Sequence, residues 1–477
     1  MDQFPSTLTI PWLRQSYREN SLTPQELAAE ILRRADTYNS RNIWITPPSM
    51  DLMGPFLDAL PKDREPLPLW GVPFAIKDNI DLAGVPTTAG CPAYAYTPQA
   101  HATVVRRLIE AGAFPVGKTN MDQFATGLVG TRSPYGETGN AWDPALISGG
   151  SSSGSAVAVA LGLAAFSLGT DTAGSGRVPA ALNTLVGYKP PLGAWSTAGV
   201  VPACASLDCV TVFAHSSTDA ATVNQAARGD DPGCPWSKPL GEPTRAMPRT
   251  LYVLDGDLPF YGRYQDAYRS KWAKAKRRFG QICKDTEGMR ALPIDGGMFR
   301  EAAAILYDGP WVAERWKDLG PFVASHPGAT FPVTETILRC GENPAYTAVS
   351  LFEAMHKLQG LRKTTRELLK DALLCMPTAG GTFPRDEVRA DPIGANSKMG
   401  LYTNHCNLLD LCAIAIPENT QDKDIPFGVT LFALPENEGM LFWAAGRFLA
   451  SQSAGQAAQT ANPQQVEARR EGNSHGQ

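Results

Sequence analysis

Short apolar runs alternate along this chain with segments whose apolar residues recur at helical spacing. The runs predict strands at residues 72–76, 114–117 and 165–168, and the periodic segments predict helices at 101–111 and 155–163. Segments rich in proline and glycine link these elements. This order of strands and helices predicts an α/β protein with a largely buried sheet.

The two ends of the chain differ from this middle part. Residues from about 6 to 40 are expected to be largely helical, with Thr23 as an N-cap and Pro24 at the first helical position. From residue 451 to 477 the sequence is rich in Gln, Ala, Ser and Asn and has almost no large apolar side chain. We therefore expect one domain over residues 1–450 and a flexible tail or the start of a linker over residues 451–477.

Composition and charge narrow the class of protein. The chain has 477 residues, of which 43% are hydrophobic and 19% charged, with a formal net charge of −4. These values are ordinary for a globular enzyme, and they give no positive field that would favour nucleic acid or an anionic membrane as a partner. The basic run at residues 271–278 is interpreted as a solvated helix face.

Cysteine and histidine usage gives no sign of a metal or a disulfide framework. The nine cysteines include no CxxC pair, and the six histidines include no HExxH motif. No metal and no cofactor are therefore expected. The first residues lack a basic region followed by an apolar stretch, and the apolar segment 156–168 is too short to span a bilayer. The expected location is the cytoplasm.

Three residues carry the candidate chemistry. Ser151 lies in a Gly-Gly-Ser-Ser-Ser-Gly-Ser run, Ser175 follows Asp-Thr-Ala-Gly, and Lys77 ends the predicted strand at 72–76. A serine hydroxyl attacks an amide only when a neighbouring group accepts its proton. A lysine can do so when burial keeps it neutral, and a second serine can pass the proton between them. These residues predict acyl transfer at an amide.

The glycines near the serines have a matching explanation. The turn formed by Thr172, Ala173, Gly174 and Ser175 can direct successive N–H groups at a developing oxyanion. Glycine also lets the backbone approach a substrate closely. A phosphate-binding loop is the alternative, but the GxxxxGK[ST] pattern is missing from the sequence.

On these motifs, residues of about 60 to 215 resemble the amidase signature family, whose marks are a GGSSxGS loop and a D-[TI]-[GA]-G-S turn. The resemblance implies a large mixed β-sheet surrounded by α-helices and a homodimer. It also implies Ser175 as the nucleophile, Ser151 in a cis peptide as the bridge and Lys77 as the base. It places the oxyanion hole at the N–H groups of residues 172–175. The supporting residues would be Ser152, Asp171 and Arg177, although the last two are equally well explained as a plain structural ion pair.

Within that family the segment from Tyr307 to Trp316 resembles the amidase domain of allophanate hydrolases. The resemblance implies that Tyr307 and Arg315 bind the substrate carboxylate, a task that suits the planar guanidinium group of arginine. From spacing alone, Tyr307 would instead pack in the core and Arg315 would lie on a solvated helix face. The sequence departs from the family pattern at Ser153 and Ala205, and longer relatives continue into a second domain where this chain has its polar tail.

The sequence therefore predicts hydrolysis of the terminal amide of allophanate, with release of ammonia, through an acyl-Ser175 intermediate. Two alternatives stay within the family: an amidase for another small amide, and the amidase subunit that transamidates aminoacylated tRNA. A third is a catalytically inactive scaffold, for which the complete set of Lys77, Ser151 and Ser175 would have no use.

Overall fold

The computed structural model describes residues 4–62, 67–244, 246–307, 309–418 and 425–460, with backbone only for 453–460. One sheet of eleven strands forms its centre, in the order β1-β3-β2-β4-β6-β5-β10-β11-β9-β7-β8. The strands are β1 (Trp44–Thr46), β2 (Pro73–Lys77), β3 (Phe114–Thr119), β4 (Phe166–Asp171), β5 (Val186–Lys189), β6 (Cys209–Ala214), β7 (Thr250–Leu254), β8 (Arg290–Ile294), β9 (Ala372–Pro377), β10 (Cys412–Pro417) and β11 (Gly428–Ala433).

Sixteen α-helices lie in the described part of the chain. They are α1 (Ile10–Arg18), α2 (Pro24–Thr37), α3 (Met50–Asp58), α4 (Thr103–Glu110), α5 (Ser153–Ala160), α6 (Val178–Leu182), α7 (Ser217–Ala227), α8 (Gln265–Lys284), α9 (Gly297–Tyr307), α10 (Val312–Ser325), α11 (Pro332–Arg339), α12 (Ala348–Leu368), α13 (Arg385–Ala390), α14 (Gly394–Met399), α15 (His405–Leu408) and α16 (Glu438–Thr460). None of them is long and apolar enough to cross a membrane.

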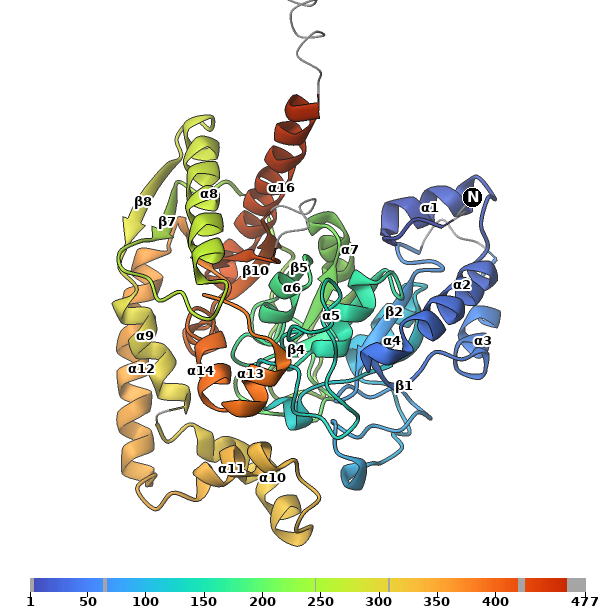
Figure 1. Cartoon of the computed structure of the whole chain (residues 1–477), viewed down its shortest axis with the longest axis horizontal. Coiled ribbons are helices and arrows are strands. Elements are labelled where there is room, and N and C mark those ends of the chain that lie inside the picture. The colour runs from blue at the N-terminus through green and yellow to red at the C-terminus, as the bar shows by residue number, and fades with distance from the viewer. Residues whose placement is uncertain (1–3, 63–66, 245, 308, 419–424, 461–477) are drawn as a thin grey trace, which may run out of the picture.

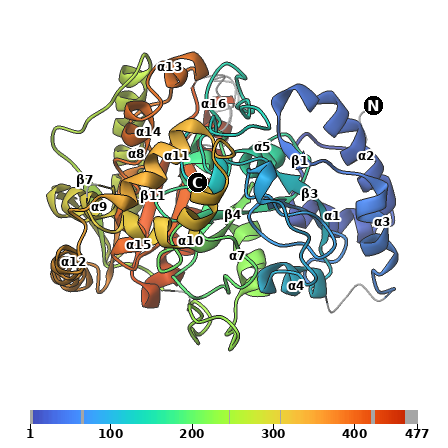
Figure 2. The ribbon, with the colours of Figure 1, turned by 90° about the horizontal axis from the view of Figure 1, so that it is seen from below.

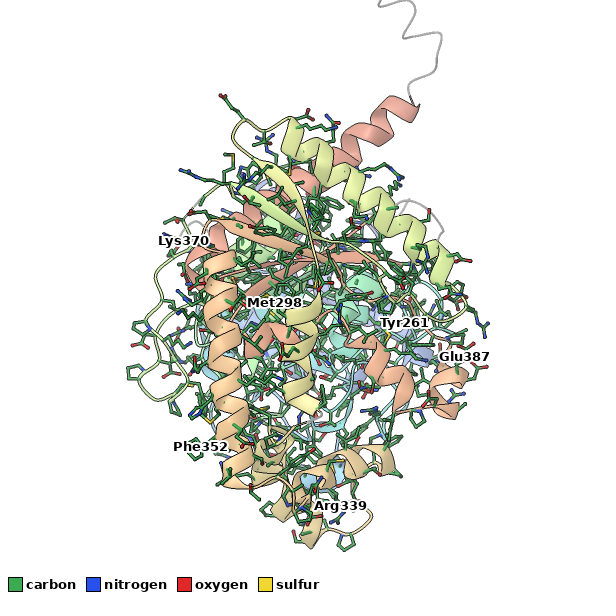
Figure 3. All side chains as sticks on the ribbon, turned by 90° about the vertical axis from the view of Figure 1, so that its left-hand side faces the viewer. Tyr261, Met298, Arg339, Phe352, Lys370 and Glu387 are labelled. Atoms are coloured by element: carbon green, nitrogen blue, oxygen red, sulfur yellow. The ribbon has the colours of Figure 1, made fainter. Side chains whose placement is uncertain are left out.

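The helices cover the sheet at both ends and in the middle. Helices α1 to α3 lie at the β1 end of the sheet, and α8, α9 and α12 lie at the β8 end (Figure 1). Seen from the β8 end, α12 runs along the outside, with Phe352 near its beginning and Lys370 just beyond its end (Figure 3). Helices α10 and α11 project below the sheet in Figure 1, and the view from below shows them in front of its central strands (Figure 2). The fold is the mixed α/β architecture that the sequence predicts.

The sheet is mixed, and its parallel part positions the site. Strand β2 pairs in parallel with both β3 and β4, whereas β4 pairs antiparallel with β6. All residues of β2, β3 and β4 are buried. Because parallel strands end at the same edge, Lys77 at the end of β2 and Asp171 at the end of β4 come to one side of the sheet.

The elements predicted from the sequence are confirmed with small shifts. Helix α2 begins at the predicted Thr23 cap, where Thr23 and Glu26 form a capping box. Helix α5 spans 153–160 instead of 155–163, because Gly162 takes a φ of +68° just after the helix ends. The expected domain boundary at residue 450 lies within α16, and residues 461–477 of the expected tail lie outside the described residues.

Candidate active site

Lys77 is fully buried at the end of β2, among polar side chains from neighbouring strands and loops. Its Nζ donates to Ser151 Oγ at 2.7 Å and to Thr170 Oγ1 at 2.7 Å. Burial lowers the pKa of Lys77 to about 7, despite nearby carboxylates that act in the opposite direction. A substantial fraction of the amine is therefore neutral near pH 7 and able to accept a proton.

Ser151 lies in a glycine-rich loop that enters α5. The peptide bond between Gly150 and Ser151 is cis, as the resemblance implies. The carbonyl of Ser151 accepts the N–H of Asp122 at 3.0 Å, and a Cβ on Gly150 would collide with the Asp122 carboxylate. Close packing against Asp122 is thus the physical reason for glycine at position 150.

The neighbouring Ser152 connects the same loop to the sheet. Its hydroxyl donates to the carbonyl of Thr170 at 3.1 Å and accepts the Thr170 N–H at 3.3 Å. Since Thr170 also accepts from Lys77, the side chain of Ser152 fixes the strand position that faces the lysine. It makes no capping bond to α5.

The turn that carries Ser175 is built around the carboxylate of Asp171. Arg177 donates to it twice, from Nε and Nη2, each at 2.9 Å, and both side chains are fully buried. The N–H groups of Gly174 and Gly176 donate to the same carboxylate at 2.9 and 3.0 Å. Burial acts to raise the pKa of Asp171, but the guanidinium of Arg177 outweighs it and the pKa lies below its ordinary value.

This arrangement corrects one part of the predicted oxyanion hole. The N–H of Gly174 is already donated to Asp171 and is not free for a substrate oxygen. Among the described residues, the N–H groups of Thr172, Ala173 and Ser175 donate to no acceptor. The turn thus offers three of the four predicted donors.

The hydroxyl of Ser175 lies 3.4 Å from the carbonyl oxygen of Gly127, to which it donates. Within the described residues it makes no hydrogen bond to Ser151. Ser175 is nearly buried, with 4% of its surface exposed. The predicted nucleophile and the predicted bridge are therefore not yet joined in this structure, whereas the bridge and the lysine are.

Tyr307 and Arg315 converge, although they belong to two different helices. Tyr307 ends α9, Arg315 lies in the first turn of α10, and the Arg315 Nη2 donates to the Tyr307 hydroxyl at 3.4 Å. The guanidinium carbon also lies 5.5 Å from the centre of the Tyr307 ring. Arg315 is only 1% exposed, so a solvated helix face, the alternative that spacing favoured, is wrong.

The sequence does not identify two further residues of the site, Asp122 and Asp208. Asp122 accepts backbone N–H groups from Val129, Gly130 and Arg132 and so organises the loop after β3. Its position shortly after a strand parallel to β2 was a usable signal, because such residues meet Lys77 at one edge. Asp208, which accepts the Thr172 hydroxyl, carried no such signal.

Known proteins with the same fold are numerous. A family model described as Amidase matches residues 26–258. A urea amidolyase of Lachancea kluyveri is 42% identical over 392 residues, which cover 81% of this chain but 21% of the relative. One subunit of the glutamyl-tRNA(Gln) amidotransferase of Prochlorococcus marinus (strain NATL2A) is 38% identical over 471 residues, covering 92% of this chain and 96% of the relative. The solved allophanate hydrolase of Kluyveromyces lactis superposes with a TM-score of 0.85 at 36% identity, covering 93% of this chain and 72% of that one.

The chain belongs to the amidase family. It spans only about a fifth of the length of the urea amidolyases that it matches, so it is similar to one part of those longer proteins.

Proposed function

We propose that this chain hydrolyses the terminal amide of allophanate and releases ammonia through a covalent acyl-Ser175 intermediate. The observation that carries the proposal is the pairing of buried Arg315 with half-buried Tyr307 in the same molecule as the Lys77–Ser151 hydrogen bond. The identity of 36% to an allophanate hydrolase over nearly the whole chain supports it.

In this proposal Lys77 is the base, Ser151 the proton bridge and Ser175 the nucleophile. When substrate binds, the Ser175 hydroxyl turns from the Gly127 carbonyl to Ser151. Catalytic hydrogen bonds are often long before a substrate is bound, so the 3.4 Å contact with Gly127 is compatible with this step. The proton then passes through Ser151 to the neutral amine of Lys77 and finally to the departing nitrogen.

Charge that develops on the substrate oxygen is received by the free N–H groups of Thr172, Ala173 and Ser175. Each such donor contributes roughly 3 kcal/mol to stabilising the transition state. The ion pair of Asp171 and Arg177 stabilises the turn that carries Ser175. Ser152 fixes Thr170 of β4 beside Lys77. Ammonia leaves, water attacks the acyl-Ser175 ester, and the dicarboxylated nitrogen product can decay to carbon dioxide and ammonia.

The substrate carboxylate binds to Arg315 and Tyr307 in this proposal. A buried guanidinium attracts a carboxylate strongly because little water competes for it. Arg315 has donors left for such a ligand, since its hydrogen bonds within the described part of the chain are those with Thr126 and Tyr307. A neutral amide would leave these donors without an anionic acceptor.

The further parts of the proposal rest on the sequence. Composition, charge and motifs favour an amidase domain over residues 1–450, a cytoplasmic location, no cofactor and no nucleic-acid partner. The family resemblance implies a homodimer. The alternative with a specific observation in its favour is a subunit of an amidotransferase, because one such protein matches 92% of this chain.

The test is ammonia release from allophanate, malonamate, glutamine and propionamide by the wild type and by Ser175→Ala. We expect a strong preference for allophanate and malonamate, and no acyl-enzyme in the variant by intact-protein mass spectrometry. Equal turnover of propionamide would refute the carboxylate role, and a preference for glutamine would favour the amidotransferase alternative. Full activity of Ser175→Ala would refute the mechanism.

A further inference from the structure

Two consecutive residues, Thr126 and Gly127, lie between the two halves of the site. The Thr126 hydroxyl accepts a hydrogen bond from Arg315 Nη1 at 3.2 Å. The carbonyl of Gly127 accepts the hydroxyl of Ser175 at 3.4 Å. The residue that would hold the carboxylate and the residue that would attack the amide are thus connected through adjacent positions of one segment.

Thr126 is held by two arginines at once. Its hydroxyl donates to the carbonyl of Phe124 at 3.2 Å, which leaves a lone pair for Arg315. Its own carbonyl accepts Arg132 Nη1 at 2.9 Å. Arg132 is 1% exposed, and its Nη2 donates to the carbonyl of Pro392 at 2.7 Å. The backbone and the side chain of Thr126 are therefore both fixed.

The segment before Thr126 adds to this rigidity. Phe124 and Ala125 both have a φ of +52°, a conformation that residues other than glycine adopt only when their surroundings require it. Gly127 has no room for a side chain, because a Cβ there would lie 2.5 Å from Asp122 Oδ2. Asp122 in turn accepts three backbone N–H groups of the following loop. The position of Gly127 is thus determined by packing as well as by hydrogen bonds.

We propose that Thr126 and Gly127 act as a spacer that fixes the distance between Arg315 and Ser175, and so selects the length of the substrate. The two contact points, the Thr126 hydroxyl and the Gly127 carbonyl, belong to consecutive residues, whose Cα atoms are about 3.8 Å apart, so a rigid segment keeps the two contacts at a constant separation. The gap between Arg315 and Ser175 suits a linear amide acid with one atom between its carboxylate and the carbonyl under attack. Arg132 is the positioning residue that holds the spacer. This inference rests on the proposed function, because it needs Arg315 to bind a carboxylate.

The experiment measures kcat and KM for a series of amide acids that differ by one methylene. Oxamate, malonamate and succinamate have no atom, one atom and two atoms in the gap, and propionamide has no carboxylate. We expect the wild type to favour malonamate over both neighbours. Thr126→Ala should lower that preference by about tenfold, the value of one hydrogen bond to a charged group, through a raised KM. Thr126→Ser keeps the hydroxyl and should keep the preference.

Arg132 is tested in the same way. Arg132→Lys keeps a charge but cannot donate to both Thr126 and Pro392 in the same geometry, so the length preference should weaken while the oxyanion turn stays intact. The matched control is Thr336→Ala, which removes an exposed threonine hydroxyl from α11 and should change nothing.

The outcomes separate the two proposals. If the wild type turns over propionamide as well as malonamate, the proposed function itself is wrong. If the wild type prefers malonamate but Thr126→Ala and Arg132→Lys keep the same ratios among the three acids, the spacer is wrong and the proposed function stands. Loss of the length preference in Thr126→Ala, with retention in Thr126→Ser, supports the spacer.

Discussion

The two halves of the site differ in how the chain encodes them. The catalytic half consists of Lys77, Ser151 and Ser175, and lies on strand ends and glycine-rich loops of the central sheet. The recognition half consists of Tyr307 and Arg315, and lies at the facing ends of two helices, α9 and α10. In the first half the turn that carries Ser175 is built locally around Asp171, although Lys77 and Ser151 are 74 positions apart in the sequence. The second half is anchored by a contact with Thr126, 189 residues before Arg315.

This difference shows which property each half controls. The catalytic half offers groups that the hydrolysis of any amide would need: a lysine amine with a pKa of about 7 and N–H groups on a turn that donate to no acceptor among the described residues. The recognition half presents a buried cation that an anionic substrate would satisfy best. In the proposed function, reaction type and substrate choice are therefore carried by separate structural elements, and substitutions should affect them separately.

The largest expected effect comes from the catalytic half. Lys77→Met removes the proton acceptor, so ammonia release should fall about ten thousand-fold or more for allophanate, malonamate and propionamide alike. The measurement is steady-state ammonia release, with circular dichroism to verify the fold. If Lys77→Met lost activity on only the carboxylated substrates, the proposed division of labour between the two halves would be wrong.

The second effect comes from the recognition half. Arg315→Met leaves an apolar side chain of similar length, so kcat/KM for malonamate should fall about a hundredfold, the cost of losing a buried charged contact. The fall for propionamide should be far smaller. A matched control is Arg106→Met, which removes an exposed arginine from an i,i+4 pair on α4 and should have no effect. Equal losses on both substrates would contradict a carboxylate-binding role.

The same contrast explains what could be predicted from the sequence. The buried strand before Lys77, the glycine turn before Ser175 and the cap of α2 depend on neighbouring residues, so their types and spacing were sufficient. The pairing of Gly174 with Asp171 was missed, because a pattern of residue types does not say which N–H groups a carboxylate will occupy.

The recognition half could be identified only by resemblance. Gly309 and Pro310 can interrupt or restart a helix between Tyr307 and Arg315, but nothing in the sequence indicates that the two side chains meet. Arg315 donates to Thr126, whose carbonyl accepts Arg132 and which follows two residues with positive φ values. Such a chain of tertiary contacts leaves no periodic signal in the sequence.

The third prediction concerns pH and sharpens the role of the lysine. Burial lowers the pKa of Lys77 to about 7, and only the neutral amine accepts a proton. The value of kcat/KM should therefore rise with pH up to about 7 and level off above it, falling about tenfold per unit on the acid side. A profile without a midpoint between pH 6 and 8 would contradict Lys77 as the base.

The same shift affects stability. An unfolded lysine holds its proton up to about pH 10.4, whereas the folded Lys77 releases it at about 7. Between these values the unfolded state binds more protons, so the free energy of unfolding gains up to about 1.4 kcal/mol per pH unit from this group. Urea unfolding at pH 7, 8 and 9 should show this gain in the wild type relative to Lys77→Met. Parallel curves would contradict the shift.

The smallest expected effect tests whether the two halves are physically coupled. Glu314, next to Arg315 in α10, accepts the N–H and the hydroxyl of Ser206 at 2.8 and 2.6 Å. Two residues further on, Asp208 accepts the hydroxyl of Thr172 in the oxyanion turn. Through these hydrogen bonds, Glu314 connects α10 to the segment from Ser206 to Asp208, which contacts the turn that carries Ser175.

Glu314→Gln keeps the shape but weakens these bonds, so the KM for malonamate should rise about fivefold, which corresponds to roughly 1 kcal/mol. The kcat should change less, because Lys77 and Ser151 do not contact Glu314. The control Glu335→Gln loses an exposed pair with Arg339 on α11 and should match the wild type. If Glu314→Gln lowered kcat and left KM unchanged, the segment from Ser206 to Asp208 would serve the oxyanion turn and not the carboxylate. The contact between Glu314 and Ser206 would then affect the reaction and not substrate binding, so the two halves of the site would not be independent.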